Sequence, residues 1–532
     1  MKFRRSAAKS PRTGDPPRIL SRFLLPPGGP SASLTARSWL LAALLFATGA
    51  WLYNRNNEFP SFYHPDESGK ARQLITGRFN FNHPLLLLQA SRVIGGIRQT
   101  PQTPQPVTET GRMASAIFAA GAVACLALLA AHLYGTLAAA CVGVLLLASS
   151  HLYELAHYMK EDTALAFGIA AFFLALTRCW LQPSVARFAF LGVAAALAVS
   201  GKYIGALVLP LALAPVFWFP EKRSRNLAVL SVAFSGVLVA VNFPIFASLG
   251  HFSGSLGREV DFTVHGHKGL TRSVPHGVYT AVFRGATNPP IWILLGVYYA
   301  RFFAFFRRIH PVEWSLALFP IVYVLILSFS PKTHHRYFLP DTLILCTLAV
   351  FGLFCLNLPG SVWLTRAAQV AAFLAALGMS GARLVACDSA FKIDSRQQLF
   401  AFLRRYVPAD ATIAQDGRVN LPNREDPRYL DSPYFLEQKV VSDVLAVSAG
   451  SLDQLRARGI RYVAVSEAEY GRYFLKTHKP REGQRADYDR GREFYGQLFR
   501  EGKLLWECKA GLLPYLQPQI RLYHLPSENP DG

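Results

Sequence analysis

Two adjacent carboxylates, Asp66 and Glu67, follow His64 and Pro65 shortly after the first long apolar segment of the chain. A carboxylate at the boundary between water and lipid can accept a proton from an attacking hydroxyl or amine. Neighbouring side chains point in different directions, so one carboxylate can be catalytic while the other is structural. The alternative is that both only stabilise the start of a helix, with the proline at or before its first turn.

A second acidic pair, Glu161 and Asp162, comes after Lys160 and directly before another apolar segment. A carboxylate at this place could hold a sugar hydroxyl, orient a basic nucleophile or join Asp66 in a divalent-cation site. The alternative is a helix cap, for which Asp162 is well suited. The candidate metal ligands are therefore Asp66 and Asp162, although the sequence requires neither this cation nor any other cofactor.

Basic and histidine residues gather in two further connectors between apolar segments. Lys202 stands in a two-residue turn, and His335 and Arg336 follow Lys332 and His334 in another. Arginine forks and lysine point charges suit a phosphate or pyrophosphate leaving group. The alternative is that these side chains only reach for the membrane surface. We favour a site, because topology alone places lysine and arginine on the opposite, cytoplasmic side.

The composition identifies the elements that must position these residues as membrane helices. Of 532 residues, 52% are hydrophobic and only 17% are charged, and the apolar residues come in long runs. This pattern is typical of a polytopic membrane protein. The net charge of +22 is explained by basic loops beside the membrane, and we predict no nucleic-acid partner.

The apolar runs predict about eleven transmembrane helices, since about 20 apolar residues cross a bilayer. The expected spans are Ala36–Tyr53, Met113–Leu133, Leu137–His151, Thr163–Trp180, Phe188–Ser200, Tyr203–Phe219, Leu227–Leu249, Pro290–Phe306, Trp314–Ser330, Tyr337–Leu356 and Ala367–Leu384. The interruption at Gly201-Lys202 decides the count. If the chain does not reverse there, ten spans remain and every later segment changes sides.

With eleven spans, the short basic loops lie inside and every acidic or histidine-rich feature lies on the outer face. Residues 1–33 are then a disordered basic cytoplasmic tail, and 34–386 are the transmembrane domain. Its outer segments include 54–112, with a helix lying in the interface near Leu85–Ile97, and a flexible loop at 250–289 that could close over a substrate.

Residues 387–532 read as a soluble extracytoplasmic α/β domain in which helical and strand patterns alternate. The expected elements are helices at Ser395–Tyr406, Leu452–Arg458 and Tyr488–Glu501 and strands at Thr412–Gln415, Arg461–Val465, Lys503–Glu507 and Arg521–His524. Cys387 and Cys508 both fall in this tail and could form a disulfide if it is extracytoplasmic.

The order of these motifs resembles the GT-C superfamily of integral-membrane glycosyltransferases, specifically the bacterial relatives of protein O-mannosyltransferases and of the lipid A aminoarabinose transferase. The resemblance covers the layout of residues 36–384. It is carried by His64-Pro65-Asp66-Glu67, Asn82-His83-Pro84, Lys160-Glu161-Asp162, Gly201-Lys202-Tyr203 and His335-Arg336-Tyr337 with Pro340.

The resemblance implies transfer of a sugar, with inversion, from a polyprenyl-phosphate donor to a lipid, glycan or protein acceptor. It implies that Asp66 is the base or positions the acceptor, supported by Glu67, with Glu161 or Asp162 as a second acidic group. It further implies phosphate binding by Lys202, Arg336 and His335. The matching residues His64, His83, Tyr203 and Tyr337 are expected to bind substrate.

This interpretation places a mannosyltransferase-like enzyme in a bacterial inner membrane, with the N-terminus in the cytoplasm and the C-terminal domain in the periplasm. Two other classes compete with it. A transporter or flippase of lipid-linked intermediates predicts charges in the middle of spans, whereas nearly all ionisable residues here lie at span ends. A non-catalytic membrane scaffold predicts that Asp66 and Arg336 can be replaced without loss of function.

Overall fold

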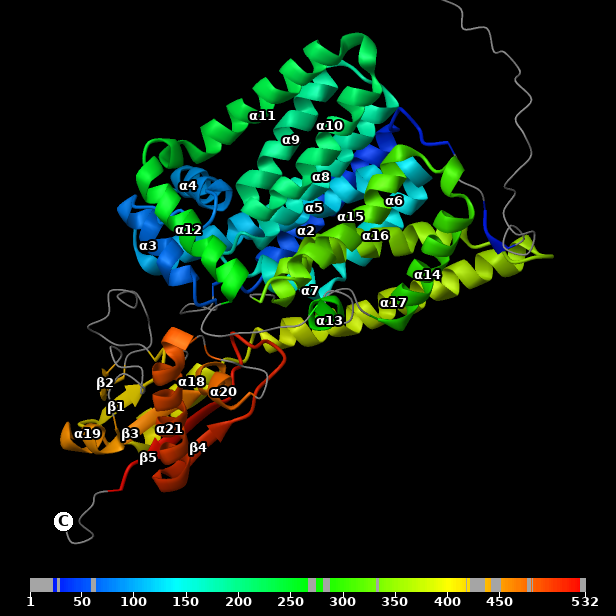
Figure 1. Ribbon diagram of the computed structural model, residues 1–532. Coiled ribbons are helices and arrows are strands. Elements are labelled where there is room, and N and C mark those ends of the chain that lie inside the picture. The colour runs from blue at the N-terminus through cyan, green and yellow to red at the C-terminus, as the bar shows by residue number, and fades with distance from the viewer. Residues whose placement is uncertain are drawn as a thin grey trace, which may run out of the picture.

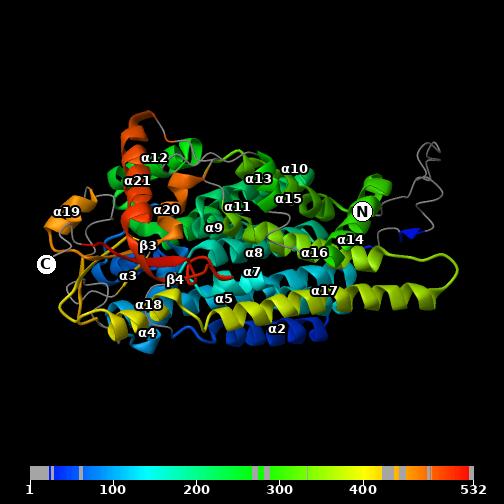
Figure 2. The same ribbon diagram turned by 90° about the horizontal axis from the view of Figure 1, so that it is seen from below.

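The computed structural model is a long bundle of helices with a small sheet at one end (Figure 1). It describes residues 23–25, 29–58, 64–266, 274–280, 288–331, 334–417, 419–421, 436–441, 451–475, 480 and 482–526. Seen from below, α2, α5, α16 and α17 run roughly alongside one another, and the strands gather at the end where α3 lies (Figure 2). Tyr63, Lys332 and His267 lie outside the described residues.

The helical part begins with α2 at Ala36–Asn54 and ends with the long helix α17 at Val362–Ala390. Between them lie α3 (Glu67–Thr76), α4 (Leu86–Arg98), α5 (Pro104–Tyr134), α6 (Thr136–Leu147), α7 (Ser150–Ala156), α8 (Asp162–Leu181), α9 (Val185–Gly201), η1 (Tyr203–Val208), α10 (Leu209–Trp218), η2 (Pro220–Lys222), α11 (Arg223–Phe246), α12 (Leu249–His265), α13 (Val274–Tyr279), α14 (Pro289–Ala304), η4 (Phe306–Arg308), α15 (Pro311–Ser328), η5 (His335–Phe338) and α16 (Leu339–Cys355).

Each of the eleven expected spans coincides with a helix or with a helix pair. Fewer than eleven of these helices are long enough to cross a membrane. In the described part of the chain, six helices are long and apolar enough to cross a membrane. A seventh qualifies if α6 and α7, which meet at a bend of 60°, form one span. The polytopic helical fold is thus observed, while the count of eleven stays a prediction.

The chain reverses at Gly201-Lys202, the point on which the eleven-span count depends. After the extended residue Lys202, η1 packs back against the end of α9, where a Cβ at Gly205 would lie 2.1 Å from the carbonyl oxygen of Ala198. Helix α10 then returns along the bundle, because the rings of Trp218 at its end and Trp180 at the end of α8 lie 5.5 Å apart. The interruption is therefore a turn between two antiparallel segments.

Small residues let the central helices approach closely, which is how membrane helices commonly pack. A Cβ at Gly168 of α8 would lie 2.5 Å from the Cα of Ala198 in α9, and one at Gly192 of α9 would lie 2.4 Å from the carbonyl oxygen of Leu230 in α11. This packing fixes the ends of α8 and α9, which carry Asp162 and Lys202, beside each other.

The C-terminal part contains a five-stranded mixed sheet with the strand order β2-β1-β3-β5-β4. Its strands are β1 (Thr412–Gln415), β2 (Lys439–Val441), β3 (Tyr462–Ser466), β4 (Lys503–Cys508) and β5 (Ile520–His524), and its helices are α18 (Ser395–Tyr406), α19 (Leu452–Ala457), α20 (Glu467–Phe474), η8 (Glu482–Gln484) and α21 (Arg485–Glu501). Strands β2, β1 and β3 are parallel, and β5 joins β3 and β4 in antiparallel pairs.

The disulfide that Cys387 and Cys508 could have formed is absent, because all seven cysteines are free. Cys387 lies on α17 with its sulfur 3.9 Å from the carbonyl oxygen of Ser150, in the helical part. Cys508 ends β4 with its sulfur 3.2 Å from the hydroxyl of Ser395. The two thiols therefore face different partners on different elements.

Candidate active site

The two carboxylates at the start of α3, Asp66 and Glu67, have opposite surroundings, and Glu67 is the buried one. The Arg112 guanidinium on α5 donates Nε to Glu67 Oε1 at 3.1 Å and Nη2 to Oε2 at 3.0 Å. The same carboxylate accepts the backbone N–H of Met159 at 2.9 Å and that of His64 at 3.2 Å. Both charged side chains are fully buried, so Glu67 ties α3, α5 and the segment before α8 together.

Replacing Glu67 with alanine should destabilise the protein strongly, because it leaves the Arg112 guanidinium buried without its counter-charge. Breaking one partner of a buried ion pair costs about 3–5 kcal/mol. Thermal unfolding of the purified protein in detergent should show a clearly lowered transition. Glu109→Ala is the matched control, since Glu109 lies on the same segment, contacts Gln105 and should leave the transition nearly unchanged. Equal transitions for the two variants would contradict the role of Glu67.

Asp66 lies next to Glu67 but is open, with 46% of its side chain exposed. Its carboxylate pairs with Lys160 and lies 4.0 Å from the Arg336 guanidinium and 3.8 Å from Nδ1 of His64. Burial opposes ionisation, but the charges of Lys160 and Arg336 outweigh it and hold the pKa of Asp66 well below its ordinary value. Asp66 is therefore an ionised, accessible oxygen base.

The second acidic pair also divides into two differently partnered groups. Glu161 is buried and pairs with Lys70 on α3, and its other oxygen lies 3.5 Å from Lys160. Asp162 is the first residue of α8, and its Oδ1 accepts a hydrogen bond of 2.7 Å from Nζ of Lys202. Its Oδ2 is buried and has no hydrogen-bond partner among the described residues.

Lys202 and Arg336 bring positive charge to Asp162 and Asp66. Both cations lie close to one aromatic ring, that of Tyr337. Lys202 Nζ lies 4.2 Å from the ring centroid and the Arg336 guanidinium 5.1 Å from it. Arg336 also donates to Nε2 of His64, and its Nη2 lies 3.4 Å from the Tyr337 hydroxyl. Connectors far apart in sequence thus form one cluster at one end of the bundle.

The charge of this cluster favours an anion over a metal ion. The pairs Arg112–Glu67 and Lys70–Glu161 are neutral, which leaves three cations, Lys160, Lys202 and Arg336, against the two carboxylates Asp66 and Asp162. Among the described residues no group of three or more His, Cys, Asp or Glu side chains could hold a metal. Because each of the two aspartates already faces a lysine, a divalent cation does not fit between them.

The remaining predicted residues lie at the edge of this cluster, except His335. His83 and Tyr203 line a cavity beside Lys202, and the Tyr203 hydroxyl donates to the carbonyl of Phe81 at 2.9 Å. His335 instead lies 3.7 Å from Glu154, with its ring 5.6 Å from that of His151. The structure therefore brings the predicted set together but directs His335 toward α7 and away from Lys202.

A largely apolar cavity of about 320 Å³ opens beside the cationic cluster. Its polar lining includes Lys202, His83 and Tyr337 and the carboxylate Glu259, and its other walls are mainly apolar side chains of η1, α12 and α15, among them Ile204, Leu256, Val260, Val264 and Leu327. Helix α12 occupies the start of the segment 250–289 that was expected to be a flexible loop. The apolar walls suit a long apolar chain, and Lys202 is the lining cation that an anionic end could meet.

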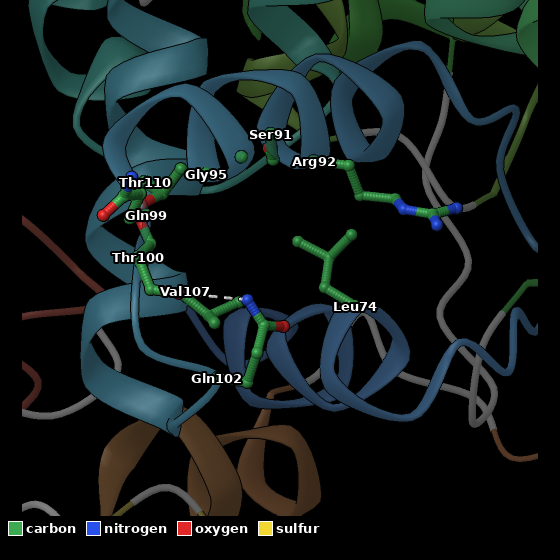
Figure 3. A pocket seen from close by; sticks show the side chains of 10 residues that line it. Leu74, Ser91, Arg92, Gly95, Gln99, Thr100, Gln102, Val107 and Thr110 are labelled. Carbon is green, nitrogen blue, oxygen red and sulfur yellow. Dashed lines mark hydrogen bonds between the residues drawn. The ribbon is translucent and has the colours of Figure 1, made fainter.

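A second, more polar cavity of about 360 Å³ lies between α3, α4 and the start of α5 (Figure 3). Leu74 points into it, and the side chains of Ser91, Gln102 and Thr110 surround it, with Arg92 at its edge. It lies apart from the cationic cluster, and none of the residues predicted from the sequence lines it.

Three partners of the predicted residues escaped the sequence analysis. Arg112 and Lys70 neutralise the buried acids, and Tyr515 from the C-terminal part reaches the cluster with its hydroxyl 3.2 Å from His334. A cation at the start of a long apolar helix was a usable signal for Arg112. No local pattern marks Lys70 or Tyr515, because only tertiary packing brings them to the site.

Comparisons with known proteins agree on the fold. Residues 107–247 match the sequence model of the family described as dolichyl-phosphate-mannose-protein mannosyltransferase, whereas a search of curated proteins finds no match. The structure of ArnT from Cupriavidus metallidurans bound to undecaprenyl phosphate has a TM-score of 0.50 and 14% identity, covering 92% of this chain and 98% of that one.

The archaeal oligosaccharyltransferase AglB from Archaeoglobus fulgidus, in complex with an inhibitory peptide and a dolichol-phosphate, has a TM-score of 0.52 and 10% identity. The alignment covers 90% of this chain and 80% of that one. At sequence identities this low, the structural similarity shows that the fold is shared. The predicted resemblance to the GT-C superfamily, related to protein O-mannosyltransferases and ArnT, is confirmed.

Proposed function

We propose that this membrane protein of GT-C fold transfers a sugar from a polyprenyl-phosphate donor to a hydroxyl of a periplasmic lipid, glycan or protein, with inversion. The observation that carries this proposal is a cluster with three cations, Lys160, Lys202 and Arg336, against two carboxylates, beside an apolar cavity that Lys202 lines. An anionic head on an isoprenoid chain has the complementary chemistry. The lipid phosphates bound to the structural neighbours ArnT and AglB support the same class of donor.

In this proposal the donor phosphate lies between Lys202 and Arg336, both of which lie close to the Tyr337 ring. The isoprenoid chain occupies the cavity that side chains of α12 and α15 line. His83 and Tyr203 border the same cavity and contact the donor. As the bond from the anomeric carbon to the phosphate oxygen breaks, negative charge grows on the phosphate. Fixed cations in a partly dehydrated site stabilise that charge without reorganising.

Asp66 acts on the acceptor in the same step. Its ionised, accessible carboxylate accepts the proton of the acceptor hydroxyl while the hydroxyl oxygen forms the new bond to the anomeric carbon. A single displacement from the face opposite the phosphate inverts the configuration. Lys160 orients Asp66 through their ion pair, and Glu67 and Glu161 hold the framework through Arg112 and Lys70.

The proposed orientation follows the charge pattern of the loops. The cluster lies on the outer face of a bacterial inner membrane, the N-terminus is in the cytoplasm and the C-terminal domain is in the periplasm. A flippase is less well supported, because the cluster lies at helix ends on one side of the bundle. A non-catalytic scaffold does not account for an open, ionised Asp66 in a cluster that has one more cation than carboxylates.

The first experiment is sugar transfer in membranes that contain the wild-type protein, with a panel of radiolabelled polyprenyl-phosphate sugars and native cell-envelope acceptors. Transfer that depends on the protein would establish the enzyme class, and the labelled product would identify the acceptor class. Binding of sugar-free undecaprenyl phosphate, measured in parallel by stabilisation of the purified protein against heat, reports on the donor site alone.

Narrowing the apolar cavity should weaken donor binding without changing the chemical step. Val260 lines the cavity on α12, and Val260→Trp should raise the apparent KM for the donor about tenfold with little change in kcat, because it removes space that binds donor and transition state equally. Steady-state kinetics with increasing donor concentration measures both constants.

Val232→Trp is the matched control, since Val232 lies on α11, is 73% exposed and does not line the cavity. Its KM should equal that of the wild type. A Val260→Trp enzyme with wild-type KM would place the isoprenoid chain elsewhere.

A further inference from the structure

The connection between β4 and β5, residues 509–519, extends from the sheet into the helical part. Leu513 and Leu516 are fully buried in the same core cluster as the membrane helices. The Gln517 amide donates to the carbonyls of Ala390 at 3.1 Å and Ile393 at 3.2 Å. These contacts hold the connection against the end of α17.

The tip of this connection places Tyr515 on the candidate active site. Its hydroxyl lies 3.2 Å from Nε2 of His334, and its ring centroid lies 4.5 Å from that of His64 and 5.9 Å from that of Tyr158. His64 in turn accepts a hydrogen bond from Arg336 and faces Asp66. Tyr515 is thus one contact away from both groups to which the proposed function assigns the chemistry.

His64 and Asp66, which both lie beside Arg336, differ sharply in their exposure to solvent. The side chain of His64 is 3% exposed, whereas that of Asp66 is 46% exposed. Tyr515 and Tyr158 pack on the imidazole, whereas the carboxylate stays open.

We propose that the C-terminal domain completes the active site by inserting Tyr515, a positioning residue that shields His64 from water and holds its imidazole against Arg336. This inference deepens the proposed function and rests on it for the catalytic consequence. The shielding itself is a property of the folded chain and can be measured without any transfer reaction.

The charge state of His64 depends on the groups that surround it. Asp66, Lys160, Asp162 and Arg336 act on it electrostatically, and Tyr158 and Tyr515 pack on its ring. Burial lowers the pKa of His64 well below its ordinary value, Arg336 and Lys160 lower it further, and Asp66 opposes them.

The test is diethylpyrocarbonate labelling of histidines in the full-length protein, read by mass spectrometry of its peptides. In the wild type, His64 should react far more slowly than His265, whose side chain is 61% exposed. Tyr515→Ala should raise the His64 rate at least tenfold, while Leu512→Ala, a change at a 59% exposed position of the same connection, should not. His132, buried at the far end of α5, should stay slow in every variant whose fold is intact.

Fast labelling of His64 in the wild type, or no increase in a folded Tyr515→Ala protein, would overturn the proposal. The wild-type comparison decides the question even if Tyr515→Ala fails to fold. Tyr515→Phe keeps the ring and should retain the protection of His64.

Activity adds a second, separable readout. Tyr515→Ala should transfer sugar at least tenfold more slowly than the wild type, whereas Tyr515→Phe, which keeps the ring on His64, should retain the wild-type rate. Equal rates in all three enzymes would overturn the positioning role. Absent transfer in every protein would instead count against the proposed function, with the labelling result unaffected.

Discussion

Asp66→Asn should reduce sugar transfer by about 10²–10⁴-fold, the usual contribution of a general base, at an unchanged level of folded protein. Asparagine keeps the size of the side chain but cannot accept the proton of the acceptor hydroxyl. The loss should appear in kcat, while binding of undecaprenyl phosphate persists, because Asp66 acts on the acceptor. Single-turnover transfer from radiolabelled donor measures the chemical step directly.

Glu109→Gln is the matched control for this variant. It removes a carboxylate from the same outer segment, at a position where the side chain only contacts Gln105, and it should transfer sugar at the wild-type rate. Gel filtration and thermal unfolding establish that both variants are folded. Transfer by Asp66→Asn at more than a tenth of the wild-type rate would remove Asp66 as the base.

The pH dependence of the wild type gives a second test of the same assignment. Lys160 and Arg336 hold the pKa of Asp66 well below its ordinary value against the effect of burial, so the carboxylate stays ionised as the pH falls to about 4, the ordinary value for aspartate. Transfer should therefore show no loss attributable to Asp66 between about pH 5 and pH 8. An acid limb in this range that disappears with Asp66→Asn would show that Asp66 titrates there and would contradict its lowered pKa.

The sequence predicts which residues meet better than how they are paired. Asp66, Lys202 and Arg336 stand at the ends of apolar runs, and ends of antiparallel membrane helices on one side of a bilayer must lie near one another. The partners of each charge depend on helix rotation and packing, which local patterns do not encode. Glu67 and Asp66 are adjacent in sequence, yet only the fold shows that Glu67 is buried against Arg112 while Asp66 is open to solvent.

The same reasoning explains which elements were found. Long apolar runs such as α5 and α16 have a periodicity and length that identify them, whereas β2 is a three-residue strand that owes its pairing to β1. Helix α20 begins directly after β3 with Ser466 as its cap, without the break that usually separates two elements. Tyr515 is the extreme case, because its role depends on a connection from one part of the chain packing into another.

Arg336→Ala should lower transfer by about 10²–10³-fold, the cost of removing one fixed donor from a developing charge. It removes the group that contacts His64 and the Tyr337 ring and that we propose faces the donor phosphate. Arg336→Lys restores the charge but not the fork and should recover only part of the rate, whereas Lys392→Ala, which removes an exposed cation paired with Asp388, should have no effect. Both Arg336 variants should bind sugar-free undecaprenyl phosphate more weakly than the wild type, in contrast to Asp66→Asn. If Arg336→Ala and Asp66→Asn instead lost acceptor and donor binding in the same proportion, the division of the site into a phosphate side and an acceptor side would be wrong.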